Sequence, residues 1–238
     1  MKIFLAVLIL LLTACATAPA KQAAIADKPE LSADDQLIRK GAELVAAGSI
    51  KQALNDYFNP VVERCEALAK NSNRKLFASR GQVETIYYMA LASAAKIDAD
   101  ALSQTCSQAL YFKGYASLDL GQPEEAMHSI QKAVEWSPVN SRYLSELGHL
   151  YQLNKDWNKS LETFQQSEEY AETFSPEAYK KDELARAKRG VGFNLIELGK
   201  LDEAEAKFKE CLALNKADKT ALGEIEYIKT LRKKSASQ

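Results

Sequence analysis

Residues 107–138 read SQALYFKGYASLDLGQPEEAMHSIQKAVEWSP, and their spacing is the most regular in the chain. Its apolar residues recur at helical spacing, and no run in it alternates with the period of two that a half-buried strand requires. Gly114 and Ala126 are small, Ile130 is large and apolar, and Pro138 closes the stretch. The pattern predicts helices that approach each other closely at the small positions.

The same spacing returns twice further along the chain. Thirty-four residues on stand Gly148, Lys155, Ser160, Phe164 and Ser167; a further 44 residues on stand Gly192, Gly199, Ala204, Phe208 and Cys211. The period is therefore 34 residues, with about ten residues inserted before the last unit. A fixed period of this length is the sequence signature of a repeat protein.

These residues resemble the tetratricopeptide repeat, which has small residues at positions 8, 20 and 27, an aromatic or apolar residue at 24, and often proline at 32. The resemblance implies an all-α fold, a tetratricopeptide-like α-solenoid of antiparallel helix hairpins. Since one hairpin cannot cover its own apolar face, the units must stack. The predicted repeats span residues 107–140, 141–174 and 185–218. An insertion at about 170–184 and a C-terminal capping helix at 218–234 are added to them, so that the repeat region as a whole covers residues 107–234.

Residues 32–106 carry fainter, degenerate copies of the repeat. Gly41, Gly48, Ala53 and Tyr57 fall at the expected offsets in the first of them. In the next copy, a turn at Gly81 would join a short helix at 74–80 to a second helix at 83–95. The alternative is one longer helix over 76–95, and the phasing of residues 66–106 stays open. On the second helix, the residues predicted to share an apolar face are Val83, Ile86, Tyr87 and Ala90.

The N-terminus resembles the signal peptide of a bacterial lipoprotein. Lys2 precedes an uncharged run from residue 3 to 14, which is too short to span a bilayer but suits a secretion signal. Small residues then precede Cys15, as in a lipobox. The resemblance implies removal of residues 1–14 and lipidation of Cys15. The alternative is an ordinary signal peptide cut near Ala16 or Ala20.

The residue after the lipobox cysteine bears on location. Ala16 stands where the enteric sorting pattern has aspartate for retention in the inner membrane, so the resemblance points to the outer membrane, facing the periplasm. Residues 15–31 are rich in Ala, Pro and Lys and read as a lipid-anchored flexible tether. The membrane is then reached through the N-terminal lipid only.

Composition excludes several function classes. The formal net charge is −1, whereas a general nucleic-acid binder usually has a basic excess. Ten Gly without a Gly-rich cluster disfavour a phosphate-binding loop. With two His, four Cys and no CxxC, we expect no metal and no cofactor. An oxidising compartment would permit a disulfide between Cys65 and Cys106, and the sequence leaves that pairing open.

No set of residues forms a recognisable catalytic constellation. His128 is predicted on an outer helix face, and His149 on a helix that lines the groove in this family. Acidic pairs such as Glu124-Glu125 suit the first turns of helices, where they complement the positive helix end. We therefore predict a chain that is not an enzyme and has no catalytic residues.

What remains is a binding surface. In tetratricopeptide-repeat proteins the first helices line a concave groove, and the resemblance maps that groove onto Tyr111, Tyr115, Arg142, His149, Arg186, Arg189 and Phe193. Aromatic and Arg side chains are favoured at protein interfaces. For Tyr111, Tyr115 and Phe193 the alternative is packing between adjacent helices.

The plan of lipid anchor and repeats predicts an outer-membrane-anchored periplasmic scaffold or adaptor. Its partner would be a protein or peptide of the cell envelope, in outer-membrane protein, pilus-secretin or cell-wall machinery. The alternative is an envelope enzyme or small-ligand carrier on a helical-repeat fold. That alternative requires a polar cluster outside the repeat pattern, near residues 74–88 or 170–182.

Overall fold

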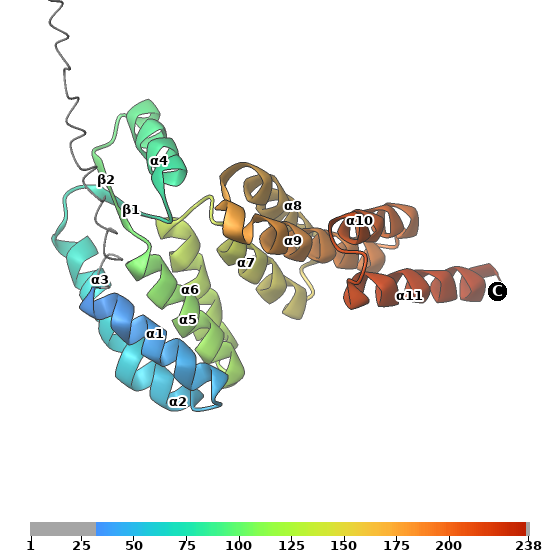
Figure 1. Ribbon diagram of the computed structural model, residues 1–238, viewed down its shortest axis with the longest axis horizontal. Helices are drawn as coiled ribbons and strands as arrows, with labels where there is room; N and C mark the ends of the chain where they lie inside the picture. Colours follow the sequence, from blue (N-terminus) through green and yellow to red (C-terminus); the bar gives the residue numbers. More distant parts are fainter. Residues whose placement is uncertain (1–31, 237–238) are drawn as a thin grey trace, which may run out of the picture. The chain divides into compact units, whose positions relative to one another are not determined.

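The computed structural model describes residues 32–236, and in this range the chain is a succession of helices with two short strands (Figure 1). The predictions for the signal peptide, for Cys15 and for the tether lie outside the described residues. Within the described range, every helix is too short or too polar to cross a bilayer.

Three helix hairpins follow one another in the second half of the chain (Figure 1). They are α5 (Thr105–Asp119) with α6 (Pro123–Trp136), α7 (Ser141–Leu153) with α8 (Trp157–Phe174), and α9 (Glu177–Glu197) with α10 (Leu201–Leu214). The turns inside the hairpins place Gly121, Lys155 and Gly199 at positive φ. The last helix, α11 (Lys219–Ala236), packs on α9 and α10. The all-α solenoid predicted from the sequence is confirmed.

Glycines let these helices approach each other. A Cβ atom at Gly114 would lie 2.7 Å from the Ile130 side chain, and one at Gly148 would lie 2.7 Å from the Phe164 ring. Phe164 also lies against Gly190 of the next hairpin, where an added Cβ would overlap the ring. The Phe164 side chain therefore fills the space between two successive hairpins.

Alanine at Gly190 is expected to destabilise the fold by about 1–3 kcal/mol, because the new methyl group overpacks the site of the Phe164 ring. The matched control is Gly223→Ala on α11, where no atom lies within 4 Å of the added Cβ. That change should stabilise the fold by up to about 1 kcal/mol, because alanine has a higher helix propensity than glycine. Urea unfolding of both variants shows whether each change raises or lowers the free energy of unfolding. Equal changes in the two variants would contradict this packing.

The N-terminal hairpin pairs α1 (Ala33–Ala46) with a helical run made of α2 (Ile50–Gln52), the π-helical segment η1 (Ala53–Phe58) and α3 (Asn59–Asn71). Pro60 explains the π-helical segment. It has no N–H to donate, and its ring crowds the carbonyl four residues earlier, so the preceding turn widens. Phe58 at the end of this segment lies against Gly41 of α1.

Between this hairpin and the three later ones lies a βαβ unit, which corrects the sequence interpretation. Strand β1 (Lys75–Ser79) pairs in parallel with β2 (Ala99–Ser103), and α4 (Gln82–Ala95) connects them. The predicted helix at 74–80 and the alternative single helix over 76–95 are both wrong, because residues 75–79 form a strand. The predicted helix at 83–95 is confirmed as α4.

The strand was missed because its evidence is not local. Leu76, Phe77 and Ala78 are all buried, and a short continuous apolar run does not distinguish a strand from a helix segment. Its hydrogen-bonding partner begins 24 positions later, with Lys75 opposite Ala99.

The orientation of α4 is also corrected. Of the four residues predicted to share an apolar face, Val83 and Ile86 are 60% and 70% exposed and Ala90 is exposed, whereas Tyr87 is partly buried against Phe174. The buried face instead holds Glu84, Tyr88 and Ala92. The buried ion pair between Glu84 and Arg80, described below, holds this face inward.

The insertion lengthens two helices. α8 runs to Phe174 and α9 begins at Glu177, so Ser175 and Pro176 alone connect them within the predicted insertion at about 170–184. Pro176 suits this place because proline fixes φ and is tolerated at a helix start.

Cys65 of α3 and Cys106 of α5 are joined by a disulfide, with Cα atoms 5.6 Å apart. The bond links the N-terminal hairpin to the first clear repeat, and its two cysteines stand on either side of the βαβ unit. Cys211 is a buried free thiol, and burial raises its pKa to about 11.

Candidate partner-binding groove

The seven predicted groove residues are divided between two cavities and the surface between them. Tyr111 and Arg142 line a cavity of about 120 Å³ between α5, α7 and α9. The second cavity, of about 220 Å³, lies between α7, α9 and α11 and is lined by four of the predicted residues: His149, Arg186, Arg189 and Phe193. Tyr115 is 39% exposed and lies within electrostatic reach of Asp119 and Glu146, which raise its pKa together with burial.

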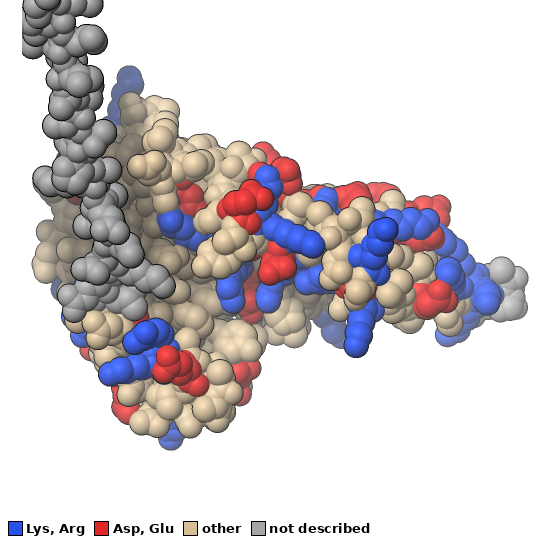
Figure 2. All heavy atoms as spheres, in the orientation of Figure 1, with Lys and Arg blue, Asp and Glu red and all other residues tan. Residues whose placement is uncertain are grey.

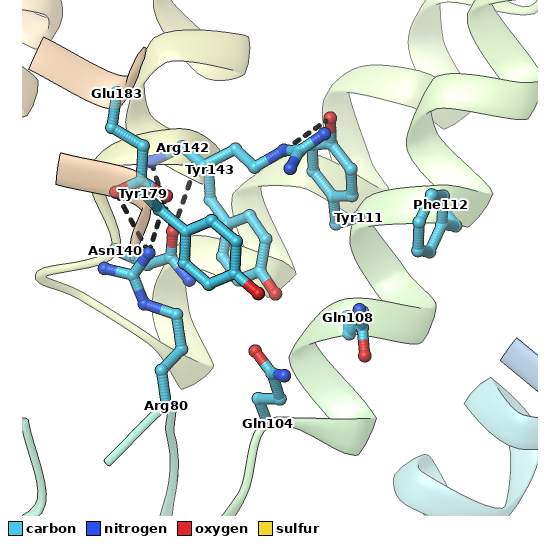
Figure 3. Close-up of a pocket in the computed structure, with 10 residues that line it drawn as sticks. All are labelled: Arg80, Gln104, Gln108, Tyr111, Phe112, Asn140, Arg142, Tyr143, Tyr179 and Glu183. Atoms are coloured by element: carbon cyan, nitrogen blue, oxygen red, sulfur yellow. Dashed lines mark hydrogen bonds and ion pairs between the residues drawn. The ribbon is translucent and has the colours of Figure 1, made fainter. Parts of the chain in front are cut away.

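In the first cavity, Tyr111 acts mainly as a packing residue. It is 5% exposed and stacks on Tyr143, with ring centroids 5.1 Å apart. Arg142 lies over the Tyr111 ring and donates from Nε to the Tyr111 hydroxyl at 3.2 Å (Figure 3). Burial alone would lower the pKa of Arg142, but its interactions with Tyr111 outweigh this and raise it. Arg142 is therefore already engaged within the chain.

Sequence reasoning missed an ionic cluster at the side of this cavity, formed by Arg80, Glu84, Glu183 and Ser175. Arg80 follows β1 and donates from Nε to Glu84 Oε1 at 2.7 Å. From Nη1 it donates to the two carboxylate oxygens of Glu183 at 2.7 and 3.0 Å (Figure 3). The Arg80 backbone N–H donates to Glu84 Oε2, and the Ser175 hydroxyl donates to Glu183 Oε2, which also accepts from Arg80. All three charged side chains are at least nine-tenths buried.

This cluster lies in the two regions where an enzyme built on this fold would need its polar groups, but its charged groups are paired with one another. Although burial lowers the pKa of Arg80, the two carboxylates outweigh it and raise that pKa. Tyr143, which lines the same cavity, is buried, and burial raises its pKa. The cluster instead joins the βαβ unit to α9.

The second cavity has an aromatic wall with cationic groups beside it. Phe164, Phe193 and Phe208 supply apolar surface, and Phe193 is 36% exposed. His149 is exposed, and its one hydrogen bond, to Gln152, is long at 3.4 Å.

The two arginines of the second cavity differ in availability. Arg189 donates to Asp218 Oδ2 at 2.7 Å, and Asp218 in turn caps α11 by accepting from the Ala221 N–H at 3.0 Å. Arg186 is half-exposed, and its hydrogen bond to Glu146 is 3.4 Å long. The Arg186 guanidinium is thus the more available cation, while Arg189 is structural.

A third cavity, of about 520 Å³, continues from the first toward α1. The two share Arg80, Gln104, Gln108 and Phe112. Within the described residues, no three His, Cys, Asp or Glu side chains are grouped so that they could hold a metal ion.

Comparison with known families identifies the repeat. A model described as tetratricopeptide repeat matches residues 107–140. The chain carries a tetratricopeptide repeat. Comparison with curated proteins finds no match.

Solved structures share the tetratricopeptide-repeat fold. PilF of Pseudomonas aeruginosa is 13% identical over 84% of this chain and 69% of its own, with a TM-score of 0.57. MamA of MSR-1 is 16% identical, and the match covers 84% of this chain and 86% of MamA, with a TM-score of 0.50. The first tetratricopeptide-repeat domain of Spaghetti, solved with an HSP90 peptide, is 18% identical. The match covers 55% of this chain and 98% of that domain, with a TM-score of 0.48.

At these identities the likeness concerns the fold alone. A tetratricopeptide-repeat fold is in general a protein–protein interaction scaffold and not an enzyme.

Proposed function

We propose that the chain binds a segment of a partner protein in the second cavity. The observation that carries this proposal is the accessible aromatic surface of Phe193 beside the half-exposed Arg186 guanidinium and the exposed His149 imidazole. An aromatic anchor site with a cation at its edge has the composition of an interface hot spot.

The lining defines the class of partner segment. The aromatic wall suits an apolar side chain, and a carboxylate next to that side chain would accept hydrogen bonds from Arg186, which holds Glu146 only at 3.4 Å. The partner segment is therefore an apolar residue with a neighbouring acidic group, on an extended peptide or on a helix.

We propose the cell envelope as the location, with the chain anchored in the bacterial outer membrane through lipidated Cys15 and facing the periplasm. The lipobox-like residues before Cys15 and the alanine after it support this. The Cys65–Cys106 disulfide is in keeping with it, because disulfides persist in oxidising compartments. The partner would then belong to outer-membrane protein, pilus-secretin or cell-wall machinery.

The binding test uses the chain without residues 1–15, which retains every described residue. Phe193→Ala and His149→Ala should each weaken capture of the envelope partner, with a loss of roughly tenfold for Phe193→Ala. The matched control is Tyr227→Ala, since Tyr227 is 50% exposed on α11 and lies outside the second cavity. Unchanged binding by Phe193→Ala would refute the site.

These positions are better probes than Arg142 and Arg189. Charge reversal at Arg142 would disturb its contact with Tyr111, and reversal at Arg189 would place a carboxylate beside Asp218. Either change would alter stability as well as binding.

The anchor is tested separately by Cys15→Ala in the full chain. Wild type should incorporate radiolabelled palmitate and fractionate with outer membranes, and Cys15→Ala should do neither. Labelling that persists in the variant would exclude Cys15 as the lipidation site.

A further inference from the structure

The solvent-facing side of α4 is apolar and carries no charge. Val83 and Ile86 are 60% and 70% exposed, and Met89 and Leu91 are 36% and 41% exposed. Glu84 is the one charged residue between Gln82 and Ala95, and it is buried. The helix therefore buries its charge and exposes its apolar side chains, the reverse of an ordinary surface helix.

This face differs from the surface of α9 to α11. Figure 2 shows that the atoms over α4 are mostly neither acidic nor basic, whereas basic and acidic atoms alternate over α9 to α11. Exposed large apolar residues on α11, such as Leu222 and Tyr227, stand among lysines and glutamates of the same helix. A contiguous apolar patch without charges marks an interaction surface.

The spacing along α4 is self-complementary. Val83, Ile86, Ala90 and Ala94 follow one another at steps of three and four, and so form one stripe opposite Tyr88 and its buried neighbours. In an antiparallel pair with Ala90 at the two-fold axis, Ile86 of each helix lies level with Ala94 of the other. Large side chains then meet small ones, and the small residues let the helix backbones approach.

We propose that the occupant of this face is a second copy of the chain, docked through an antiparallel α4–α4 contact about Ala90. The uncharged face supports this choice, because a two-fold contact between such faces buries no unpaired charge. A partner with charged contact residues would find no complement here. The proposal is independent of the partner-binding groove, since α4 does not line the second cavity.

The contact is small. A 14-residue helix is about 21 Å long, and a contact along it buries well under the roughly 800 Å² per partner of a standard interface. The dimer is therefore weak, with a dissociation constant at about the micromolar level or above.

Cysteine crosslinking tests the geometry. In the chain without residues 1–15, Ala90→Cys should form a disulfide-linked dimer under mild oxidation at least about tenfold faster than Glu203→Cys, an exposed control on α10. The native cysteines do not interfere, because Cys65 and Cys106 are paired and Cys211 is buried. Adding Ile86→Glu to Ala90→Cys should suppress the dimer, since it places two carboxylates in the contact.

Three outcomes would overturn the proposal. The first is that Ala90→Cys crosslinks no faster than Glu203→Cys. The second is that Ile86→Glu leaves the Ala90→Cys crosslinking rate unchanged while circular dichroism shows the fold intact. The third is that wild type sediments as a monomer at every concentration but binds phosphatidylcholine vesicles through Ile86, which would assign the face to a lipid surface.

Discussion

Replacing Arg80 with alanine is expected to lower the free energy of unfolding by about 3–5 kcal/mol, because two buried carboxylates lose their shared cation. Glu84 is 2% exposed and the Glu183 side chain is 8% exposed, so water cannot compensate for the lost ion pairs. Of the charged pairs in the described range, this cluster is the most deeply buried. Its loss should also release the βαβ unit from α9.

Arg64→Ala is the matched control for Arg80→Ala. Arg64 pairs with Asp34 on the surface, where the two side chains are 50% and 32% exposed. An exposed pair contributes at most about 1 kcal/mol. Chemical denaturation followed by circular dichroism gives both values. A loss at Arg80→Ala no greater than that at Arg64→Ala would show that Glu84 and Glu183 reach solvent or find other partners.

The second large effect is expected at the disulfide. The double substitution of Cys65 and Cys106 by serine should destabilise the chain by about 4 kcal/mol, because a cross-link between residues 41 apart restricts the unfolded chain. The bond also holds α3 against α5 at either side of the βαβ unit.

Reduction of wild type should reproduce most of this loss, measured as a lower midpoint of urea unfolding. The variant itself should be insensitive to reductant, and Cys211→Ala in an otherwise native chain should leave the reductant response intact. If wild type unfolds at the same urea concentration with and without reductant, the disulfide does not stabilise the fold.

The regular repeats could be predicted from sequence because their determinants are local. Gly114, Gly148 and Gly192 mark close helix contacts within a fixed period, and the structure places Ile130, Phe164 and Phe208 against them. The helix opened by Ser175 and Pro176 also follows from local turn chemistry.

The βαβ unit could not be predicted in this way because its elements depend on distant residues. Strand β1 exists through its pairing with β2, and the orientation of α4 depends on Arg80 and on Glu183, which stand 103 positions apart. Glu84 is the single charge in an otherwise uncharged helix, and it was the available signal that the side of α4 with Glu84 and Tyr88 faces inward.

The candidate site was predicted in part. The repeat pattern brought His149, Arg186, Arg189 and Phe193 to one cavity, but it did not show that Arg186 is the more available of the two arginines. Arg189 is engaged by Asp218 and Tyr111 by Tyr143, and both contacts join different helices. Availability for a partner depends on such contacts rather than on repeat position.

Binding of a partner segment in the second cavity can be tested by site-specific photocrosslinking in intact envelopes. A photoreactive phenylalanine analogue at Phe193 should capture one partner species, whereas the same analogue at His128, which is exposed on the outer helix α6, should capture none. Capture of that partner from His128 but not from Phe193 would contradict the account.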